Sequence, residues 1–225
     1  MGRRIPKRSE REELGKGIKK RNWFKEYVEP IFIAVLIALF IRTFIVQAFK
    51  IPSSSMEPTL LVGDHILVNK FLYGIRIPYS DRIFGFSKKF FEGKKPQRGD
   101  IIVFIFPKDR SKDYIKRVIA TEGEKVEILQ NKIYINGQLI DDPWGHFEGM
   151  KYLQPLERFG PVEVPEGSLF VLGDNRDNSQ DSRFWGYANL KDVKGKAFII
   201  YFSKNATAEN LIDKIRWVRF GKLIR

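Results

Sequence analysis

The sequence has 225 residues, of which 43% are hydrophobic and 30% charged, and its formal net charge is +13. This apolar and aromatic content is sufficient to bury a core, so a mostly disordered chain is excluded. The absence of cysteine excludes a disulfide framework, a thiol nucleophile, a zinc–cysteine site and an iron–sulfur cluster. His65 and His146 are the only histidines in the sequence, which argues against a multi-histidine metal centre.

The N-terminal part predicts a basic arm followed by a transmembrane anchor. Residues 1–27 hold ten Lys or Arg and four Glu, a net charge of +6. Residues 28–49 are an apolar run of 22 residues, about 33 Å long as a helix and therefore long enough to cross a bilayer. The positive charge before this span predicts a cytoplasmic N-terminus, with the chain from residue 50 onward outside the cytoplasm.

Two other interpretations of residues 28–49 are open. The run could be a cleaved signal peptide, with Val46 and Ala48 as the small residues of its cleavage site. It could also be a core helix of a soluble domain. The long region before the run, and Arg42 ahead of the candidate cleavage site, favour an anchor over a signal peptide. Too little of the following sequence is helical in pattern to surround a core helix.

Beyond residue 50 the pattern predicts an all-β body, because short apolar runs alternate with Gly and Pro. Asn136-Gly137 lies between two alternating runs, which is typical of a hairpin. Only residues 208–218 show a weak helical period. A basic and aromatic stretch at 82–98 suits either a loop on an anionic membrane surface or a solvated loop. The expected strands lie in residues 66–68, 101–106, 114–120, 132–140, 168–172 and 196–202.

Three segments concentrate hydroxyl groups, amines and Gly-rich turns. Residues 51–60 contain three serines between two prolines, and this segment alone could equally be a linker. In residues 114–119, strand alternation places Lys116 and Arg117 on opposite apolar faces, so one cation must occupy a partly buried site. Lysine can lose its proton there, whereas arginine cannot. Residues 173–186 lack the spacing of a calcium-binding loop and are typical of a hydrogen-bonded scaffold.

In this order and spacing the three segments resemble bacterial type I signal peptidases. The resemblance covers about residues 28–205. It is carried by Pro-Ser-x-Ser-Met-x-Pro-Thr-Leu at 52–60, Arg-Gly-Asp at 98–100, Tyr-Ile-Lys-Arg-Val at 114–118 and a 14-residue loop at 173–186. The sequence departs from the family after the lysine strand, where Ala-Thr-Glu-Gly-Glu at 120–124 stands in place of Gly-x-Pro-Gly-Asp.

The resemblance implies a mainly β, signal-peptidase-like fold. One transmembrane helix would precede an all-β catalytic body over residues 50–225, with a small β insertion at about 125–165. It also implies a membrane-bound serine endopeptidase of the bacterial plasma membrane that removes signal peptides from secreted preproteins after a small–x–small motif. The implied partners are preproteins bound as extended peptides and an anionic phospholipid membrane. No nucleic acid, cofactor or metal is implied.

The resemblance further implies a role for each matching residue. Ser55 would be the nucleophile, Lys116 the general base of a serine–lysine dyad, and Ser53 the hydroxyl of the oxyanion hole. Ser179 would orient the lysine amine, and Asp181 with Arg183 would form a supporting pair. The remaining polar residues of the loop are interpreted as structural: Asp174, Asn175, Arg176 and Asp177.

Three alternatives are weighed against this hypothesis. A self-cleaving repressor shares the dyad, but here the basic arm leads into an apolar run and not into a helix-turn-helix pattern. A catalytically inactive membrane adaptor has no need of both Ser55 and Lys116. A Ser-His-Asp hydrolase would have to use His65, at the start of an expected strand, or His146, which we expect to be exposed in the insertion.

Overall fold

The structure is a computed structural model that describes residues 23–74, 93–147, 158–205, 207–208, 210 and 213–225. Three predicted features therefore lie partly outside the described residues: most of the basic arm, residues 82–92 of the basic aromatic stretch, and residues 148–157 of the insertion. The chain divides into two compact units, Met1–Ile41 and Arg42–Arg225.

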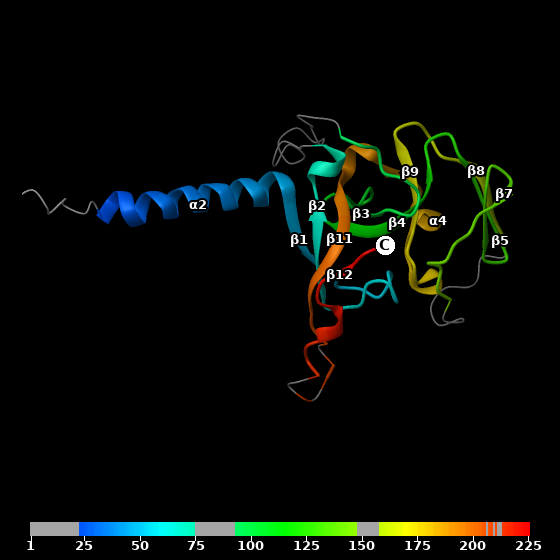
Figure 1. Ribbon diagram of the computed structural model, residues 1–225. Helices are drawn as coiled ribbons and strands as arrows, with labels where there is room; N and C mark the ends of the chain where they lie inside the picture. The colour runs from blue at the N-terminus through cyan, green and yellow to red at the C-terminus, as the bar shows by residue number, and fades with distance from the viewer. Residues whose placement is uncertain (1–22, 75–92, 148–157, 206, 209, 211–212) are drawn as a thin grey trace, which may run out of the picture. The chain divides into compact units, whose positions relative to one another are not determined.

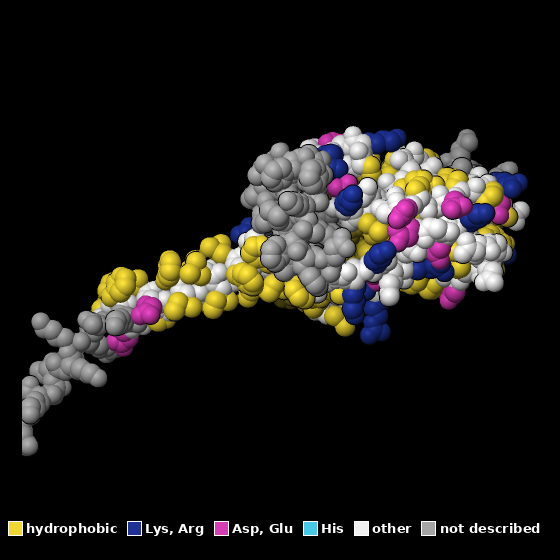
Figure 2. Space-filling model, turned by 90° about the horizontal axis from the view of Figure 1, so that it is seen from above, with side chains coloured by type: hydrophobic (Ala, Val, Ile, Leu, Met, Phe, Trp, Pro, Cys, Tyr) yellow, Lys and Arg dark blue, Asp and Glu magenta, His cyan; other side chains and the backbone are white. Residues whose placement is uncertain are grey.

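The first unit contains most of the apolar helix, whose last residues belong to the second unit. The α-helical part, α2 (Glu29–Phe40), lies between two π-helical turns, η1 (Phe24–Val28) and η2 (Ile41–Ile45). No side chain of α2 is buried, and Figure 2 shows hydrophobic side chains along its surface. A helix that is apolar on all sides needs an apolar surrounding. Over its 20 residues, Glu26–Ile45, it is long and apolar enough to cross a membrane.

The helix ends earlier than the predicted span. Residues 46–49 were expected in the anchor, but they belong to strand β1 (Val46–Lys50), which pairs antiparallel with β2 (Asp64–Asn69). Residues 46–49 can be apolar without lying in a membrane, because they are part of a sheet. Phe49, for example, packs against a buried cluster of the second unit. Hydropathy alone does not distinguish an apolar strand from the end of an apolar helix.

The second unit is built on one large antiparallel sheet (Figure 1). Its order is β1-β2-β11-β3-β4-β9-β10, and β12 pairs with β11. Register shifts in β11 interrupt its pairing with both β2 and β3, which is the mark of β-bulges. The remaining strands of this sheet are β3 (Ile101–Ile105), β4 (Asp113–Thr121), β9 (Ser168–Leu172), β10 (Ala188–Asn189), β11 (Val193–Ser203) and β12 (Lys222–Leu223).

A smaller sheet of order β7-β6-β5-β8 lies in the stretch of the predicted insertion. The hairpin at Asn136-Gly137 is confirmed, with φ of 53° and 79° at the two turn residues, as an Asn-Gly turn of the I′ type requires. The four strands are β5 (Lys125–Leu129), β6 (Lys132–Ile135), β7 (Gln138–Leu139) and β8 (Arg158–Glu163).

Short helices connect the strands of the second unit. The described residues of 208–218 contain no α-helix, so the weak helical period there was misleading; they form turns and the start of η6 (Trp217–Arg219). The other short helices are η3 (Phe71–Tyr73), η4 (Arg176–Asn178), α4 (Ser182–Trp185) and η5 (Leu190–Asp192). The mainly β fold with one apolar N-terminal helix is as predicted.

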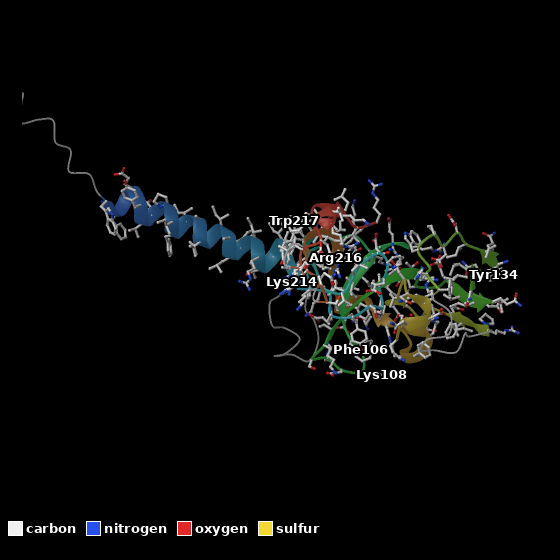
Figure 3. All side chains as sticks on the ribbon, turned by 90° about the horizontal axis from the view of Figure 1, so that it is seen from below. Phe106, Lys108, Tyr134, Lys214, Arg216 and Trp217 are labelled. Atoms are coloured by element: carbon white, nitrogen blue, oxygen red, sulfur yellow. The ribbon has the colours of Figure 1, made fainter. Side chains whose placement is uncertain are left out.

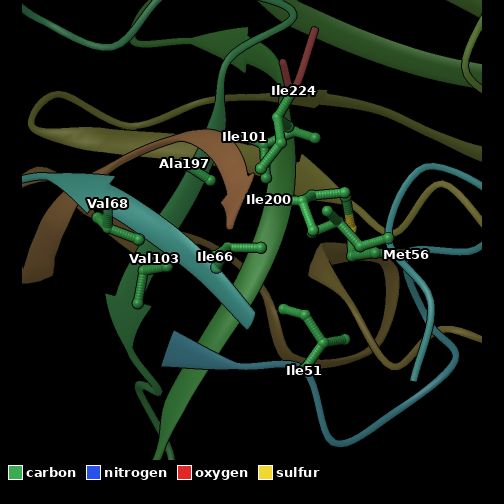
Figure 4. Packing of buried hydrophobic residues seen from close by; sticks show 10 residues of the cluster. Ile51, Met56, Ile66, Val68, Ile101, Val103, Ala197, Ile200 and Ile224 are labelled. Atoms are coloured by element: carbon green, nitrogen blue, oxygen red, sulfur yellow. The ribbon is translucent and has the colours of Figure 1, made fainter. Parts of the chain in front are cut away.

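Buried side chains form three clusters. In the cluster of Figure 4, Ile51 and Met56 from the β1–β2 connection pack with Ile66, Ile200 and Ile224. A second cluster joins β4 and β9 to the small sheet, so the two sheets share a core. Each fully buried apolar side chain of this size contributes roughly 1.5–3 kcal/mol. The core therefore fixes the connection between β1 and β2, which carries the three serines.

Candidate active site

The connection between β1 and β2 holds Ser55 in a defined position. Ile51, Met56 and Leu60 are at most 2% exposed and belong to the cluster of Figure 4. The backbone turns tightly here, because the Leu60 N–H donates to the Met56 carbonyl at 2.8 Å. Since the residue after Ser55 is completely buried, the core determines where the Ser55 side chain points.

Lys116 reaches Ser55 from β4. Its Nζ lies 2.6 Å from Ser55 Oγ, although 61 positions separate the two residues in sequence. Both are buried, with 4% of Lys116 and 9% of Ser55 exposed. The Tyr114 ring, two residues earlier on the strand, lies 5.7 Å from the amine. The structure thus brings together the two residues that the sequence predicts as nucleophile and base.

The surroundings of the amine change its acidity. Burial lowers the pKa of Lys116 from 10.5 to about 8, because a poorly solvated site disfavours the charged ammonium. The carboxylates of Asp181 and Asp174 act in the opposite direction and raise this pKa, whereas the Arg183 guanidinium lowers it. A useful fraction of the amine is therefore neutral at mildly alkaline pH and able to accept a proton.

The loop after β9 contacts the backbone of the serine segment. The Asn175 N–H donates to the Ser55 carbonyl at 3.1 Å, and Asn178 Nδ2 donates to Ser54 Oγ at 2.8 Å. A Cβ on Gly173 would lie 2.2 Å from Ser179 Oγ and 2.4 Å from the Ser55 carbonyl oxygen. Only a glycine permits the loop to approach the serine segment so closely.

A buried ion pair lies beside the dyad. Arg117, next to Lys116 on β4, donates to the Asp174 carboxylate from Nε at 2.8 Å and from Nη2 at 2.7 Å. Both side chains are fully buried, and Asp174 also accepts the Thr59 hydroxyl at 2.6 Å. The sequence predicts that one of the two neighbouring cations is partly buried; the structure buries both. The buried charge of Arg117 is paired with a carboxylate, whereas burial lowers the pKa of Lys116.

Asp181 and Arg183 pair at the start of α4. Arg183 Nε donates to Asp181 Oδ1 at 2.8 Å, and Nη2 donates to Oδ2 at 2.9 Å. Asp181 also accepts the Gly173 N–H at 3.1 Å, and Arg183 donates to the Arg176 carbonyl at 2.7 Å. The pair thus holds two points of the loop backbone. Its supporting role in catalysis stays a prediction.

The other two predicted site residues make no described hydrogen bond to the dyad. Ser53 is exposed, two residues before Ser55. Ser179 is 1% exposed, and its Oγ has no hydrogen-bond partner among the described residues. The oxyanion role of Ser53 and the orienting role of Ser179 therefore stay predictions.

The histidines lie elsewhere. His65 packs edge-on against the rings of Tyr201 and Phe202, with centroids 5.9 and 5.3 Å away. His146 is exposed, as expected, and its backbone N–H donates to the Asp174 carbonyl at 2.7 Å. The group that meets Ser55 Oγ is the Lys116 amine.

Three residues at the site received no individual role from the sequence: Arg117, Thr59 and Asn178. All three lie inside the motifs at 52–60, 114–118 and 173–186. Of these three, Arg117 could have been singled out from the sequence, because a permanently charged side chain on an apolar strand face requires a buried partner. The sequence does not say which carboxylate that partner is.

Comparison with known proteins decides the family. Residues 24–202 match the family described as signal peptidase, peptidase S26. The chain is also 38% identical to a signal peptidase I of Pseudomonas fluorescens, over 83% of this chain and 75% of that protein. The chain belongs to the S26 signal peptidases. It is a signal peptidase I enzyme, a peptidase that removes signal peptides, as the sequence predicts.

Two further relatives of this signal peptidase carry the same name. The signal peptidase I of Aquifex aeolicus (strain VF5) is 36% identical over 80% of this chain and 84% of its own length. A crystal structure of a signal peptidase I from Enterococcus faecalis V583 is 35% identical, covers 46% of this chain and 97% of its own, and superposes with a TM-score of 0.38.

In the turn after β4 the sequence departs from the family pattern, because the proline is missing. Other contacts form the turn instead. The Glu124 N–H donates to the Thr121 carbonyl at 3.2 Å, and Gly123 has φ of +79°. The Glu124 carboxylate accepts the Thr121 N–H at 2.7 Å. A side-chain acceptor and a glycine of positive φ close this turn without the proline.

Proposed function

We propose that this signal peptidase cleaves with Ser55 as nucleophile and Lys116 as general base. The 2.6 Å approach of Lys116 Nζ to Ser55 Oγ carries the proposal. The neutral amine accepts the hydroxyl proton as Oγ attacks the scissile carbonyl carbon, and the resulting ammonium protonates the leaving amine. Water then gives a proton to the same amine while its oxygen attacks the acyl carbon. The bond from that carbon to Ser55 Oγ breaks, the acid product leaves, and the ammonium returns its proton to Oγ.

The developing oxyanion would be bound by the Ser53 hydroxyl and the Ser55 N–H. The exposure of Ser53 supports this role, because its hydroxyl has to meet substrate and not protein. Losing one such donor typically costs about 10²–10³ in rate. The buried hydroxyl of Ser179, which has no hydrogen-bond partner among the described residues, is available to orient the lysine amine, and this supports the predicted role. Asp181 and Arg183 would keep the loop in place.

The preprotein would bind as an extended peptide along the free edge of β4. Pairing with β3 covers Asp113–Arg117, whereas pairing with β9 begins only at Arg117. Within the described residues, Asp113–Lys116 therefore have one unpaired edge, which ends at the dyad. A peptide added there places alternate side chains on one face. That alternation fits the predicted small–x–small motif, because the two small side chains would point to the same face of the peptide.

We also propose a location in the bacterial plasma membrane, with a cytoplasmic arm, an anchor and an extracytoplasmic body. The apolar helix Glu26–Ile45 supports the anchor. An anionic phospholipid surface as partner is supported by Trp217 and Val218, which are 62% and 92% exposed, and by the net charge of +13. Exposed aromatic side chains are typical of surfaces that meet lipid head groups, and a positive charge favours anionic lipids.

The test uses purified full-length protein in detergent and a secretory precursor with an Ala-x-Ala site. Wild type, Ser55→Ala, Lys116→Ala and the double variant His65→Ala/His146→Ala are compared by the mass of the released product. We expect cleavage after the second Ala by wild type and by the histidine variant, and none by the other two. Cleavage by Ser55→Ala or Lys116→Ala would overturn the dyad. Loss of cleavage in the histidine variant would favour a histidine base.

A further inference from the structure

A segment of the insertion is joined to the loop after β9 by a largely buried ion pair. This segment, Asp142–Phe147, lies after strand β7 in the chain and is called the clamp segment. Both carboxylate oxygens of Asp142 accept from the Arg176 guanidinium: Oδ2 from Nη1, and Oδ1 from Nη2 at 2.8 Å. The side chains of Arg176 and Asp142 are 2% and 13% exposed. Arg176 Nε donates back to the Gly173 carbonyl at 3.0 Å.

The clamp segment also pairs with the loop through its backbone. The His146 N–H donates to the Asp174 carbonyl at 2.7 Å, and the Arg176 N–H donates to the His146 carbonyl at 2.8 Å. Between these two bonds lies Asn175, whose N–H donates to the Ser55 carbonyl at 3.1 Å. Asn175 therefore connects the clamp segment directly to the backbone of the nucleophile.

Trp144 forms a second connection. Its ring lies 4.5 Å from the guanidinium carbon of Arg117, a cation–π distance. Arg117 in turn holds Asp174 with two hydrogen bonds, and Asp174 holds the Thr59 hydroxyl at 2.6 Å. Two separate routes thus lead from the clamp segment to the serine segment, one ending at Ser55 and one at Thr59.

We propose that Asp142 is a positioning residue for Ser55: it fixes Arg176, and through the loop it fixes the nucleophile against Lys116. The inference rests on the proposed function of Ser55. An arginine–carboxylate fork defines both distance and angle. A buried ion pair gives little net stability, and its best-supported use is to select one arrangement over others. The insertion then contributes to catalysis, because it supplies Asp142, which fixes the position of the loop after β9.

The expected effect of losing this contact is kinetic. A misplacement of the nucleophile by about 1 Å costs up to about 10² in rate. In Asp142→Ala we expect kcat to fall by about 10- to 100-fold, with KM for the preprotein changed by less than about threefold. Because Asp142 lies outside the free edge of β4, the proposed binding site for substrate is unaltered. Asp142→Glu, which keeps the carboxylate, should recover part of the lost kcat.

Asp141→Ala is the matched control, since Asp141 is the neighbouring aspartate and is exposed. The three variants Asp142→Ala, Asp142→Glu and Asp141→Ala are assayed with wild type as full-length protein in the same detergent, with the folded fraction measured by near-UV circular dichroism. Hydrogen exchange of the peptide containing Asn175 supplies a readout independent of activity. We expect this amide to exchange at least about tenfold faster in Asp142→Ala, and at the wild-type rate in Asp141→Ala.

The outcomes separate the two proposals. If Ser55→Ala retains wild-type cleavage, Ser55 is not the nucleophile, and the positioning role of Asp142 falls with it. If Ser55→Ala is inactive but Asp142→Ala has wild-type kcat, the positioning role is overturned. It is equally overturned if Asp142→Ala loses activity only in proportion to its folded fraction, with unchanged exchange of the Asn175 amide and no recovery in Asp142→Glu. Lower kcat per folded molecule with faster exchange supports it.

Discussion

The burial of Lys116 affects both the reactivity of its amine and the stability of the folded protein, in opposite directions. Burial lowers its pKa from 10.5 to about 8, so at mildly alkaline pH a large part of the amine is neutral, as the proposed role of general base requires. The same burial makes the charged form costly, so the folded protein is destabilised wherever the amine is protonated. One side chain therefore couples reactivity to stability, and both consequences can be measured as a function of pH.

The first consequence concerns activity. We expect kcat/KM to rise with pH through a midpoint at about 8, because only the neutral amine can accept the Ser55 proton. Lys116→Arg should be inactive across the range, since arginine keeps its proton. The measurement is preprotein cleavage at low substrate concentration in a series of buffers. A midpoint near the ordinary lysine value of 10.5 would contradict the lowered pKa.

The second consequence concerns stability. Between pH about 8 and 10.5 the unfolded chain holds the Lys116 proton and the folded chain does not. The unfolding free energy of wild type therefore rises with pH across this interval, by about 3 kcal/mol in total. Lys116→Met lacks this titration, so it should be the more stable protein at pH 7 and should lose that advantage by pH 10.5.

Thermal unfolding in one detergent at several pH values measures the difference. Lys108→Met, at an exposed position on the β3–β4 connection (Figure 3), is the control and should follow wild type at every pH. If the difference in stability between Lys116→Met and wild type is the same at every pH, the Lys116 amine has the same pKa in the folded and the unfolded protein, which contradicts the prediction.

At the scale of elements, the site depends on how closely the loop after β9 approaches the serine segment. At Ser55 the contact is made between main chains, because the Asn175 N–H donates to the Ser55 carbonyl. Gly173 has no room for a Cβ, because the nearest atoms, Ser179 Oγ and the Ser55 carbonyl oxygen, would lie 2.2 and 2.4 Å away. A backbone oxygen cannot turn aside as a flexible side chain can.

We therefore expect Gly173→Ala to move the loop and the nucleophile apart, with a fall in kcat of about 10² or more. Gly137→Ala is the control: its Cβ would meet no atom within 4 Å, although φ is +79°. It should lower stability by about 1 kcal/mol through backbone strain and leave kcat unchanged. Full activity of Gly173→Ala would show that the two segments can separate without affecting the dyad.

The strands illustrate what local sequence can predict. β3, β4 and β9 were expected because each contains a short apolar run, and the Asn136-Gly137 hairpin because both turn residues tolerate positive φ. Each of these signals is contained in a few consecutive residues. The end of the apolar helix was missed at 46–49, because the pairing of β1 with β2 depends on residues further along the chain.

At the scale of the whole molecule, the topology across the membrane is open to a direct test, since the chain contains no cysteine. A single Lys108→Cys on the exposed β3–β4 connection (Figure 3), and separately a single Ser9→Cys in the basic arm, serve as reporters. In intact spheroplasts we expect a membrane-impermeant maleimide to label Lys108→Cys only, with Ser9→Cys labelled after lysis. The reverse pattern would invert the proposed orientation.

By itself the sequence determined the family, the all-β character of the body and the apolar helix, and it singled out Ser55 and Lys116 as the predicted nucleophile and base, because these reside in composition, short-range periodicity and ordered motifs. Only the tertiary structure decided the 2.6 Å approach of those two side chains, the lowered pKa, the free edge of β4 and the grip of Asp142 on Arg176. Distances, solvation and ion-pair partners are properties of segments far apart in the chain. They exist only after packing has brought those segments together and excluded water from between them.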